Sequence, residues 1–182
     1  VSIKELEQLE ENIVRDGCRE PLCVWSNTIL DSHNRYEICR RLNIPFSIHH
    51  IILFNREEAI AWICTNQLGR RNITIATRKY LIGKRYETEK ILGEHNVEGL
   101  NQYSRKVVRS EMYTEPHIEE TFTRTREKLG REYNISDCTV YKYGIYANAI
   151  DMLSQVKPKL VMKILSGKVK VSHENILELT RL

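Results

Sequence analysis

The sequence has none of the signals that mark a membrane-spanning or a secreted protein. No apolar run approaches the roughly 18 residues that a transmembrane helix needs, and no secretory signal pattern is present. The five cysteines are scattered without a CxxC pair, and their odd number is a poor basis for a disulfide framework. We therefore expect reduced thiols in a cytoplasmic protein without a membrane partner. Because the chain begins with Val1 rather than Met, we also expect it to be trimmed, and an N-terminal strand could be missing.

Several catalytic and metal-binding patterns are absent too. No GxxxxGK[ST] sequence occurs, which excludes a Walker-type phosphate loop. His49 and His50 are adjacent in a β-rich segment, so their side chains point to opposite faces of the strand and cannot share one ion. No nucleophile–base pair can be identified. The sequence thus predicts no metal site and identifies no catalytic residue.

The charged residues are nearly balanced overall but unevenly distributed. The chain carries 28 basic and 24 acidic residues. Residues 70–90 hold seven basic residues against two acidic ones, and residues 121–147 hold five against three, with Arg124 and Arg126 among them. Clustered basic residues favour a polyanionic partner. The alternative is an ordinary solvated helix face.

The first part of the chain reads as a small mixed α/β unit. Apolar residues at helical spacing predict a first helix, and Gly17 ends it. Asn55 and Glu58 form a capping-box pattern that predicts a later helix start. The expected elements are helix 3–16, a hairpin of strands 22–25 and 27–30, helix 34–42, a β-rich segment 46–53 and helix 56–68.

The second part reads as helical. Thr74 is the expected N-cap of a long helix that ends near residue 92, and residues 93–120 lack a clear period and read as a loop or partly disordered linker. Pro158 begins a short helix that Gly167 closes, and Ser172 caps the last one. The predicted domains are therefore 1–72 (α/β), 73–120 (basic helix and polar loop) and 121–182 (helical). The predicted fold class is α+β.

Residues 127–147 fit a helix-turn-helix, the compact two-helix unit that many proteins use to bind DNA. Gly130 supplies a small residue where the two helices would cross, and Asn134 tolerates the positive φ of the turn. Ile135 would enter the core, Ser136 would cap the second helix, and Val140 would pack back on the first. An ordinary helical hairpin within a core is the alternative interpretation.

If this unit binds DNA, the exposed face of its second helix would enter the major groove. Lys142 is better suited to a phosphate than to a base, and Tyr141 could instead be a packing residue. The expected DNA-binding residues are Ser136, Asp137, Thr139, Tyr141, Lys142, Arg124 and Arg126.

A strand-to-helix turn at residues 31–35 is a candidate phosphate site. Backbone N–H groups at the positive end of a helix dipole suit an anion, and Arg35 adds a forked cation. A second polar cluster follows the helix that ends at residue 68. Solvated polar loops are the alternative for both. The expected nucleotide-binding residues are Ser32, His33, Asn34 and Arg35 in the turn, and Asn66, Gln67, Arg70 and Arg71 in the second cluster.

The order of these segments resembles the ParB family. A DSHNRYEIC turn, then NQLGRRNIT, a basic helix and a helix-turn-helix cover nearly the whole chain. The resemblance implies a sulfiredoxin-like N-terminal fold, CTP bound with Mg²⁺, a homodimer around double-stranded DNA, and a partition ATPase as a further partner. It assigns the phosphate-binding box to residues 32–35 and the second box to Asn66, Gln67 and Arg70. The chain departs from the family where Ser32 replaces a glycine and Asn66 replaces an acidic residue suited to Mg²⁺.

Three functions are consistent with these sequence features. The leading hypothesis is a ParB-like, sequence-specific DNA-binding protein of the nucleoid, acting in DNA partition or in regulation of a mobile element. The second is an enzyme on the same fold, a nucleotide-dependent phosphotransferase or a nuclease. Since the turn offers few carboxylates for a metal, we expect at most a weak CTPase and no nuclease. The third is a transcription regulator that does not depend on nucleotide.

Overall fold

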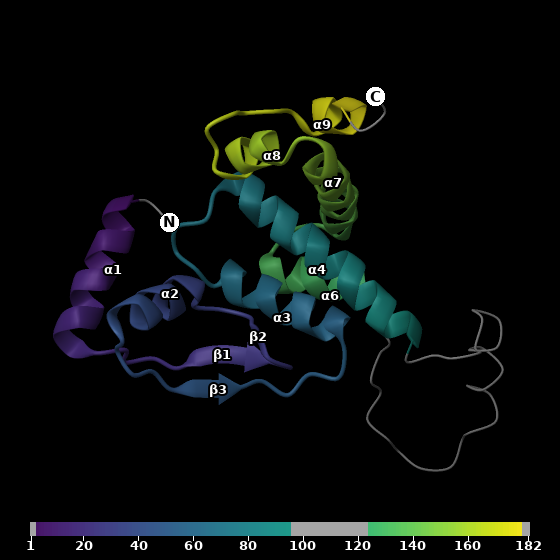
Figure 1. The fold of residues 1–182 in the computed structure, drawn as a ribbon. Helices are drawn as coiled ribbons and strands as arrows, with labels where there is room; N and C mark the ends of the chain where they lie inside the picture. Colours follow the sequence, from purple (N-terminus) through teal and green to yellow (C-terminus); the bar gives the residue numbers. More distant parts are fainter. Residues whose placement is uncertain (1–2, 96–123, 180–182) are drawn as a thin grey trace, which may run out of the picture. The chain divides into compact units, whose positions relative to one another are not determined.

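The computed structural model of the 182-residue chain describes residues 3–95 and 124–179 (Figure 1). The chain divides into two compact units, Val1–Ala59 and Ile60–Leu182, and each is considered by itself below. Both helices and strands are present, so the predicted α+β class is confirmed. No helix in the described ranges is long and apolar enough to cross a membrane.

The first unit combines two helices with a small mixed sheet. Its elements are α1 (Ile3–Asp16), β1 (Leu22–Trp25), β2 (Thr28–Ile29), α2 (His33–Leu42) and β3 (Ile48–His50). The strand order is β2-β1-β3. Strand β1 pairs with β2 in antiparallel register, with Val24 opposite Ile29, and with β3 in parallel register, with Leu22 opposite Ile48. The central strand therefore supplies the buried residues Leu22 and Val24.

Local sequence explains the hairpin and the helix packing of this unit. Ser26 and Asn27 both have positive φ, at 43° and 62°, which matches the right-handed twist that a two-residue hairpin turn requires. Helices α1 and α2 pack through Ile13, Ile38 and Cys39, all of which are buried. The apolar stripe that predicted α1 thus forms one side of this core.

Helix α3 (Arg56–Leu68) begins in the first unit and ends in the second. The Asn55 side chain accepts a hydrogen bond from the Glu58 N–H at 2.8 Å, as the capping-box pattern predicts. The Glu58 carboxylate accepts from the Phe54 N–H at 2.9 Å rather than from the N-cap itself. Both bonds satisfy amide groups near the helix start, so the sequence signal and the helix boundary agree.

The second unit is helical in its described part. It contains α4 (Ile75–His95), α6 (Thr125–Tyr133), α7 (Asp137–Val156), α8 (Pro158–Leu165) and α9 (His173–Leu179). Helix α7 contacts each of the other four (Figure 1). Its buried residues form one core with α8 and α9, in which Ile150, Ile164 and Ile176 are each at most 2 % exposed. Helix α7 is therefore the central element of this unit.

Helices α4 and α7 cross at a pair of glycines. A Cβ atom on Gly83 would lie 1.8 Å from the Tyr143 carbonyl oxygen, and one on Gly144 would lie 2.7 Å from the Tyr86 ring. Real Cβ atoms do not approach other heavy atoms so closely. The α7 backbone therefore packs directly on Gly83, and the Tyr86 side chain packs directly on Gly144. Polar contacts reinforce the crossing, since Tyr80 donates to Asp151 at 2.7 Å and Lys84 forms an ion pair with the same carboxylate.

Several predicted boundaries need correction. The β-rich segment 46–53 forms a strand only over Ile48–His50, because Pro45 precedes it and only three residues pair with β1. The long helix from the Thr74 cap continues to His95, so residues 93–95 belong to a helix rather than to the expected loop. The rest of the predicted loop, residues 96–120, lies outside the described residues.

Candidate nucleic-acid interface and nucleotide-binding turn

The α6–α7 pair has the tight turn that the sequence predicts. Asn134 ends α6 in the left-handed conformation, at φ 55° and ψ 49°. Ser136 precedes α7, and its hydroxyl accepts a hydrogen bond from the Thr139 N–H at 3.1 Å. A Cβ on Gly130 would lie 2.9 Å from the Ile135 carbonyl oxygen, so the small residue is needed where the turn passes α6. Each of these three local expectations is confirmed.

The core beneath this turn is also as expected. Leu129 and Val140 are fully buried and pack with Tyr86, while Tyr133 and Ile135 are partly buried beside them. Packing of Val140 against the first helix fixes the angle between α6 and α7. The outer face of α7 is consequently held in one orientation over its first two turns.

The predicted DNA-binding residues fall into two groups. Tyr141, which is 52 % exposed, and the exposed Lys142 and Arg124 present their side chains to solvent. The other four are engaged within the turn. Ser136 and Thr139 share a hydroxyl contact of 2.7 Å, and Arg126 Nε lies 3.4 Å from Asp137 Oδ2. The first group is available to a partner, whereas the second shapes the turn.

A buried arginine on α4 links this helix to α6. Arg85 is 8 % exposed. Its Nε lies 2.6 Å from Glu89 Oε1, and its Nη1 lies 2.5 Å from Glu132 Oε1 and also donates to the Tyr133 hydroxyl. Burial raises the pKa of Glu132, but the hydrogen bond and charge of Arg85 outweigh it, so this pKa lies below its ordinary value of 4.5. The position of Arg85 within the basic stretch 70–90 suggested a surface charge, so its structural role was not predicted from the sequence.

The candidate phosphate turn opens α2 in an unusual conformation. Ser32, the N-cap, has φ 74° and ψ 28°, and its side chain makes no capping hydrogen bond. The first turn of α2 holds no acidic residue. An uncapped helix start with no acidic residue in its first turn suits an anion. The left-handed backbone also gives a physical reason for glycine at this position, where the ParB resemblance expects one.

Arg35 is less available than the sequence suggests. Its Nη2 lies 2.7 Å from Glu20 Oε2, and its side chain is 23 % exposed against 74 % for Glu20. The glutamate is free to move into solvent because it is mostly exposed. A phosphate at this turn would thus compete with Glu20 for the guanidinium group.

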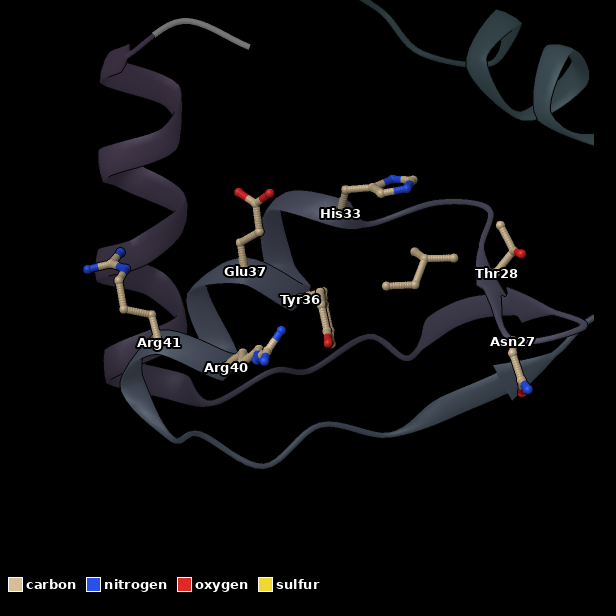
Figure 2. Close-up of a pocket in the computed structure, with 8 residues that line it drawn as sticks. Asn27, Thr28, His33, Tyr36, Glu37, Arg40 and Arg41 are labelled. Atoms are coloured by element: carbon tan, nitrogen blue, oxygen red, sulfur yellow. The ribbon is translucent and has the colours of Figure 1, made fainter.

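An open pocket of about 770 Å³ lies beside α2 (Figure 2). Of the predicted nucleotide residues only His33 lines it. Figure 2 shows the other lining side chains along α2 and at the hairpin, and Arg41 also forms a 2.6 Å ion pair with Glu10 on α1. The lining residues are Asn27, Thr28, Ile29, His33, Tyr36, Glu37, Arg40 and Arg41. This set was not predicted from the sequence, because a pocket depends on how α2 lies against the neighbouring hairpin, which no local signal specifies.

The second predicted cluster surrounds the end of α3. Asn66, Arg70 and Arg71 are exposed and Gln67 is half-buried. The cluster belongs to the second unit, whereas residues 32–35 belong to the first. A site shared by the two clusters therefore stays a prediction. Within residues 3–95 and 124–179, no three or more His, Cys, Asp or Glu side chains gather as a metal site requires.

Replacing Ser32 with glycine is expected to stabilise the first unit. A left-handed conformation costs an L-residue roughly 1–2 kcal/mol, while glycine loses more chain entropy on folding and offsets part of that gain. We expect an increase of about 0.5–1 kcal/mol in the free energy of unfolding, measured by urea denaturation. Ser32→Ala keeps the Cβ atom and should give no increase. Equal stabilisation by both variants would contradict the strain argument.

Comparison with known proteins finds similarity at the level of solved structures. No family model matches the chain, and no curated protein matches it. A solved structure described as the C2221 form of a Pnob8-like ParB-N domain is similar, with a TM-score of 0.49 and 18 % sequence identity. The similarity covers 100 % of this chain and 71 % of the other. At this level it carries no argument about function.

Proposed function

We propose that this chain is a ParB-like protein that binds specific sites on double-stranded DNA, with the start of α7 in the major groove. The observation that carries the proposal is the α6–α7 turn. A left-handed Asn134, a capping Ser136 and the close approach at Gly130 hold the exposed Tyr141 and Lys142 in place. A helix held at this angle with exposed polar side chains fits the groove-reading geometry of two-helix DNA-binding units.

The ParB resemblance adds the biological context of this proposal. It supplies a role in DNA partition or in regulation of a mobile element, a homodimer as the binding form, and a partition ATPase as a further partner. The resemblance rests on the order of the DSHNR turn, the NQLGRR segment and the α6–α7 pair along the chain. A nuclease is disfavoured, because metal-dependent phosphodiester cleavage needs clustered carboxylates that neither polar segment provides.

The experiment begins with selection of binding sites from a random duplex library, followed by fluorescence anisotropy on the selected site. Tyr141→Ala with Lys142→Ala should weaken specific binding by roughly 10- to 100-fold, since a base or phosphate contact is worth about 1–3 kcal/mol. Lys4→Ala with Met152→Ala is a matched control, because both residues are exposed and neither belongs to the α6–α7 turn. Unchanged affinity in the first double variant would exclude this docking.

A second function, nucleotide binding, is favoured by the uncapped start of α2. We propose that residues 32–35 hold the phosphates of CTP with Mg²⁺, with Arg35 exchanging Glu20 for the nucleotide. Calorimetric titration with CTP, ATP and GTP tests this. Selective CTP binding should be lost in Arg35→Ala and kept in Arg19→Ala, which removes an equal charge from the protein surface. An effect of CTP on DNA affinity would separate this function from a nucleotide-independent regulator, and turnover of CTP would indicate a weak CTPase.

A further inference from the structure

One stretch of the second unit carries positive charge alone. Residues 152–172 contain five lysines and no aspartate or glutamate, in a chain with 24 acidic residues among 182. All five lysines are exposed. In the described part of the chain, lysine ion pairs are formed by Lys84, Lys90 and Lys128, and these residues lie outside this stretch. The lysine segment is defined as Lys157, Lys159, Lys163, Lys168 and Lys170.

The fold holds this segment with its charges outward. Val161 and Ile164 of α8 are 6 % and 2 % exposed and belong to the core with α7 and α9. The last carbonyl of α8, on Leu165, accepts a hydrogen bond of 2.8 Å from the Thr77 hydroxyl of α4. Lys159 and Lys163 are four residues apart and thus share one helix face. Because the apolar face of α8 is already buried in protein, it is not available to enter a lipid surface.

After α8 the chain runs back toward the N-terminal half of α7, the helix whose start is proposed to enter the major groove of DNA. The His173 ring at the start of α9 stacks on Tyr146, with 5.8 Å between ring centroids and 18° between planes. Tyr146 is one helical turn from Lys142. Burial lowers the pKa of His173, the charges of Lys79 and Lys142 lower it further, and Glu174 opposes them. The start of α9, which directly follows the loop that contains Lys168 and Lys170, therefore lies near Lys79 of α4 and Lys142 of α7.

We propose that the lysine segment binds the sugar–phosphate backbone of duplex DNA beside the groove that α7 enters. This inference rests on the proposed DNA-binding function and adds a second contact surface to it. Phosphate contacts fix the register of a protein on the duplex without reading its sequence. The segment thus contributes affinity to every duplex, whereas Tyr141 and Lys142 contribute to the preferred one.

Salt dependence of binding tests the surface directly. Each phosphate contact steepens the slope of log K against log[salt] by about 0.9. Lys159→Gln, Lys163→Gln and Lys170→Gln together should make the slope shallower by about 2–3, equally on the selected site and on a random duplex. Lys4→Gln, Arg15→Gln and Arg19→Gln remove the same charge from exposed positions of the first unit and should leave the slope unchanged. An unchanged slope in the first variant overturns the surface.

A second measurement uses the unaltered chain, so it does not depend on how a variant folds. Limited lysine acetylation followed by mass spectrometry should show several-fold slower labelling of the lysine segment on duplex DNA, with Lys4 unaffected. Equal labelling with and without bound duplex overturns the proposal. Tighter binding to phosphatidylserine vesicles or to single-stranded RNA than to any duplex would also overturn the proposal. Failure of the unaltered chain to bind any duplex overturns the proposed function itself, whereas binding without protection overturns this inference alone.

Discussion

Gly83→Ala is expected to lower the free energy of unfolding of the helical unit by about 3 kcal/mol. The new Cβ would lie 1.8 Å from the oxygen and 2.3 Å from the carbon of the Tyr143 carbonyl, and both are backbone atoms of α7. No rotamer change relieves a clash with backbone, so α4 and α7 must separate and lose packing along their crossing. Overpacking usually costs about 1–3 kcal/mol and occasionally more. The helix-propensity gain of alanine, about 1 kcal/mol, is too small to reverse the sign.

Thermal unfolding followed by circular dichroism measures this effect. One kcal/mol shifts the Tm of a chain of this size by roughly 2–4 °C, so a fall of about 6–12 °C is expected. Gly69→Ala is the matched control. A Cβ there would lie 3.5 Å from the Asn66 carbonyl oxygen, which is ordinary contact, and Gly69 has no positive φ. Equal Tm values for the two variants would show that the helices do not cross at Gly83.

Arg85→Gln is expected to cost the same unit about 3 kcal/mol at neutral pH. The substitution removes the cation that pairs with both Glu89 and Glu132 and leaves Glu89 its exposed partner Lys128. The Glu89 and Glu132 side chains are only 15 % and 39 % exposed. Removing one partner of a buried ion pair costs about 3–5 kcal/mol. The lower end applies here because Glu132 is partly solvated. Arg131→Gln removes an exposed guanidinium from α6 and should change stability by less than about 0.5 kcal/mol.

The cost of Arg85→Gln should depend on pH in a defined direction. The pKa of Glu132 is lower in the folded chain than its ordinary value of 4.5, so pairing with Arg85 stabilises the fold fully above that value. This stabilisation is lost as the pH falls through the lowered, folded-state pKa. Urea denaturation at several pH values should therefore show the two proteins converging in stability as the pH falls below 4.5 and through the lowered pKa of Glu132. A constant difference from neutral to strongly acidic pH would contradict the assignment of Glu132 as the partner.

Signals that act over a few residues predicted the local structure well. Asn55 and Glu58 placed the start of α3, Thr74 placed the start of α4, and Ser136 placed the start of α7. Each cap side chain accepts a hydrogen bond from a backbone N–H group three residues away, so the start of the helix can be predicted from the local sequence. The same holds for Asn134, whose tolerance of positive φ is a property of the single residue.

Contacts between distant segments could not be predicted in the same way. The crossing at Gly83 and Gly144 depends on which helices meet, and a lone glycine within a helical pattern is at most a hint of close packing. Arg85 looked like one more surface charge because its partner Glu132 lies 47 residues away. The predicted nucleotide site spans residues 32–35 and 66–71, whose meeting depends on tertiary arrangement rather than on any local signal. The pocket beside α2 was missed although its lining residues all lie between Asn27 and Arg41, because the position of α2 against the hairpin is also set by tertiary packing.

The contact between α4 and α7, which are far apart in the sequence, also affects how the chain folds during its synthesis. Lys84 and Asp151, whose ion pair joins α4 to α7, are 67 residues apart. At a synthesis rate of about 5–20 residues per second, α4 leaves the ribosome roughly 3–13 s before its partner helix exists. During that interval Tyr86, which is 8 % exposed in the folded chain and packs with Val140 of α7, has no partner helix to cover it. Newly made chains are thus open to chaperone capture or aggregation at α4 until α7 has been translated.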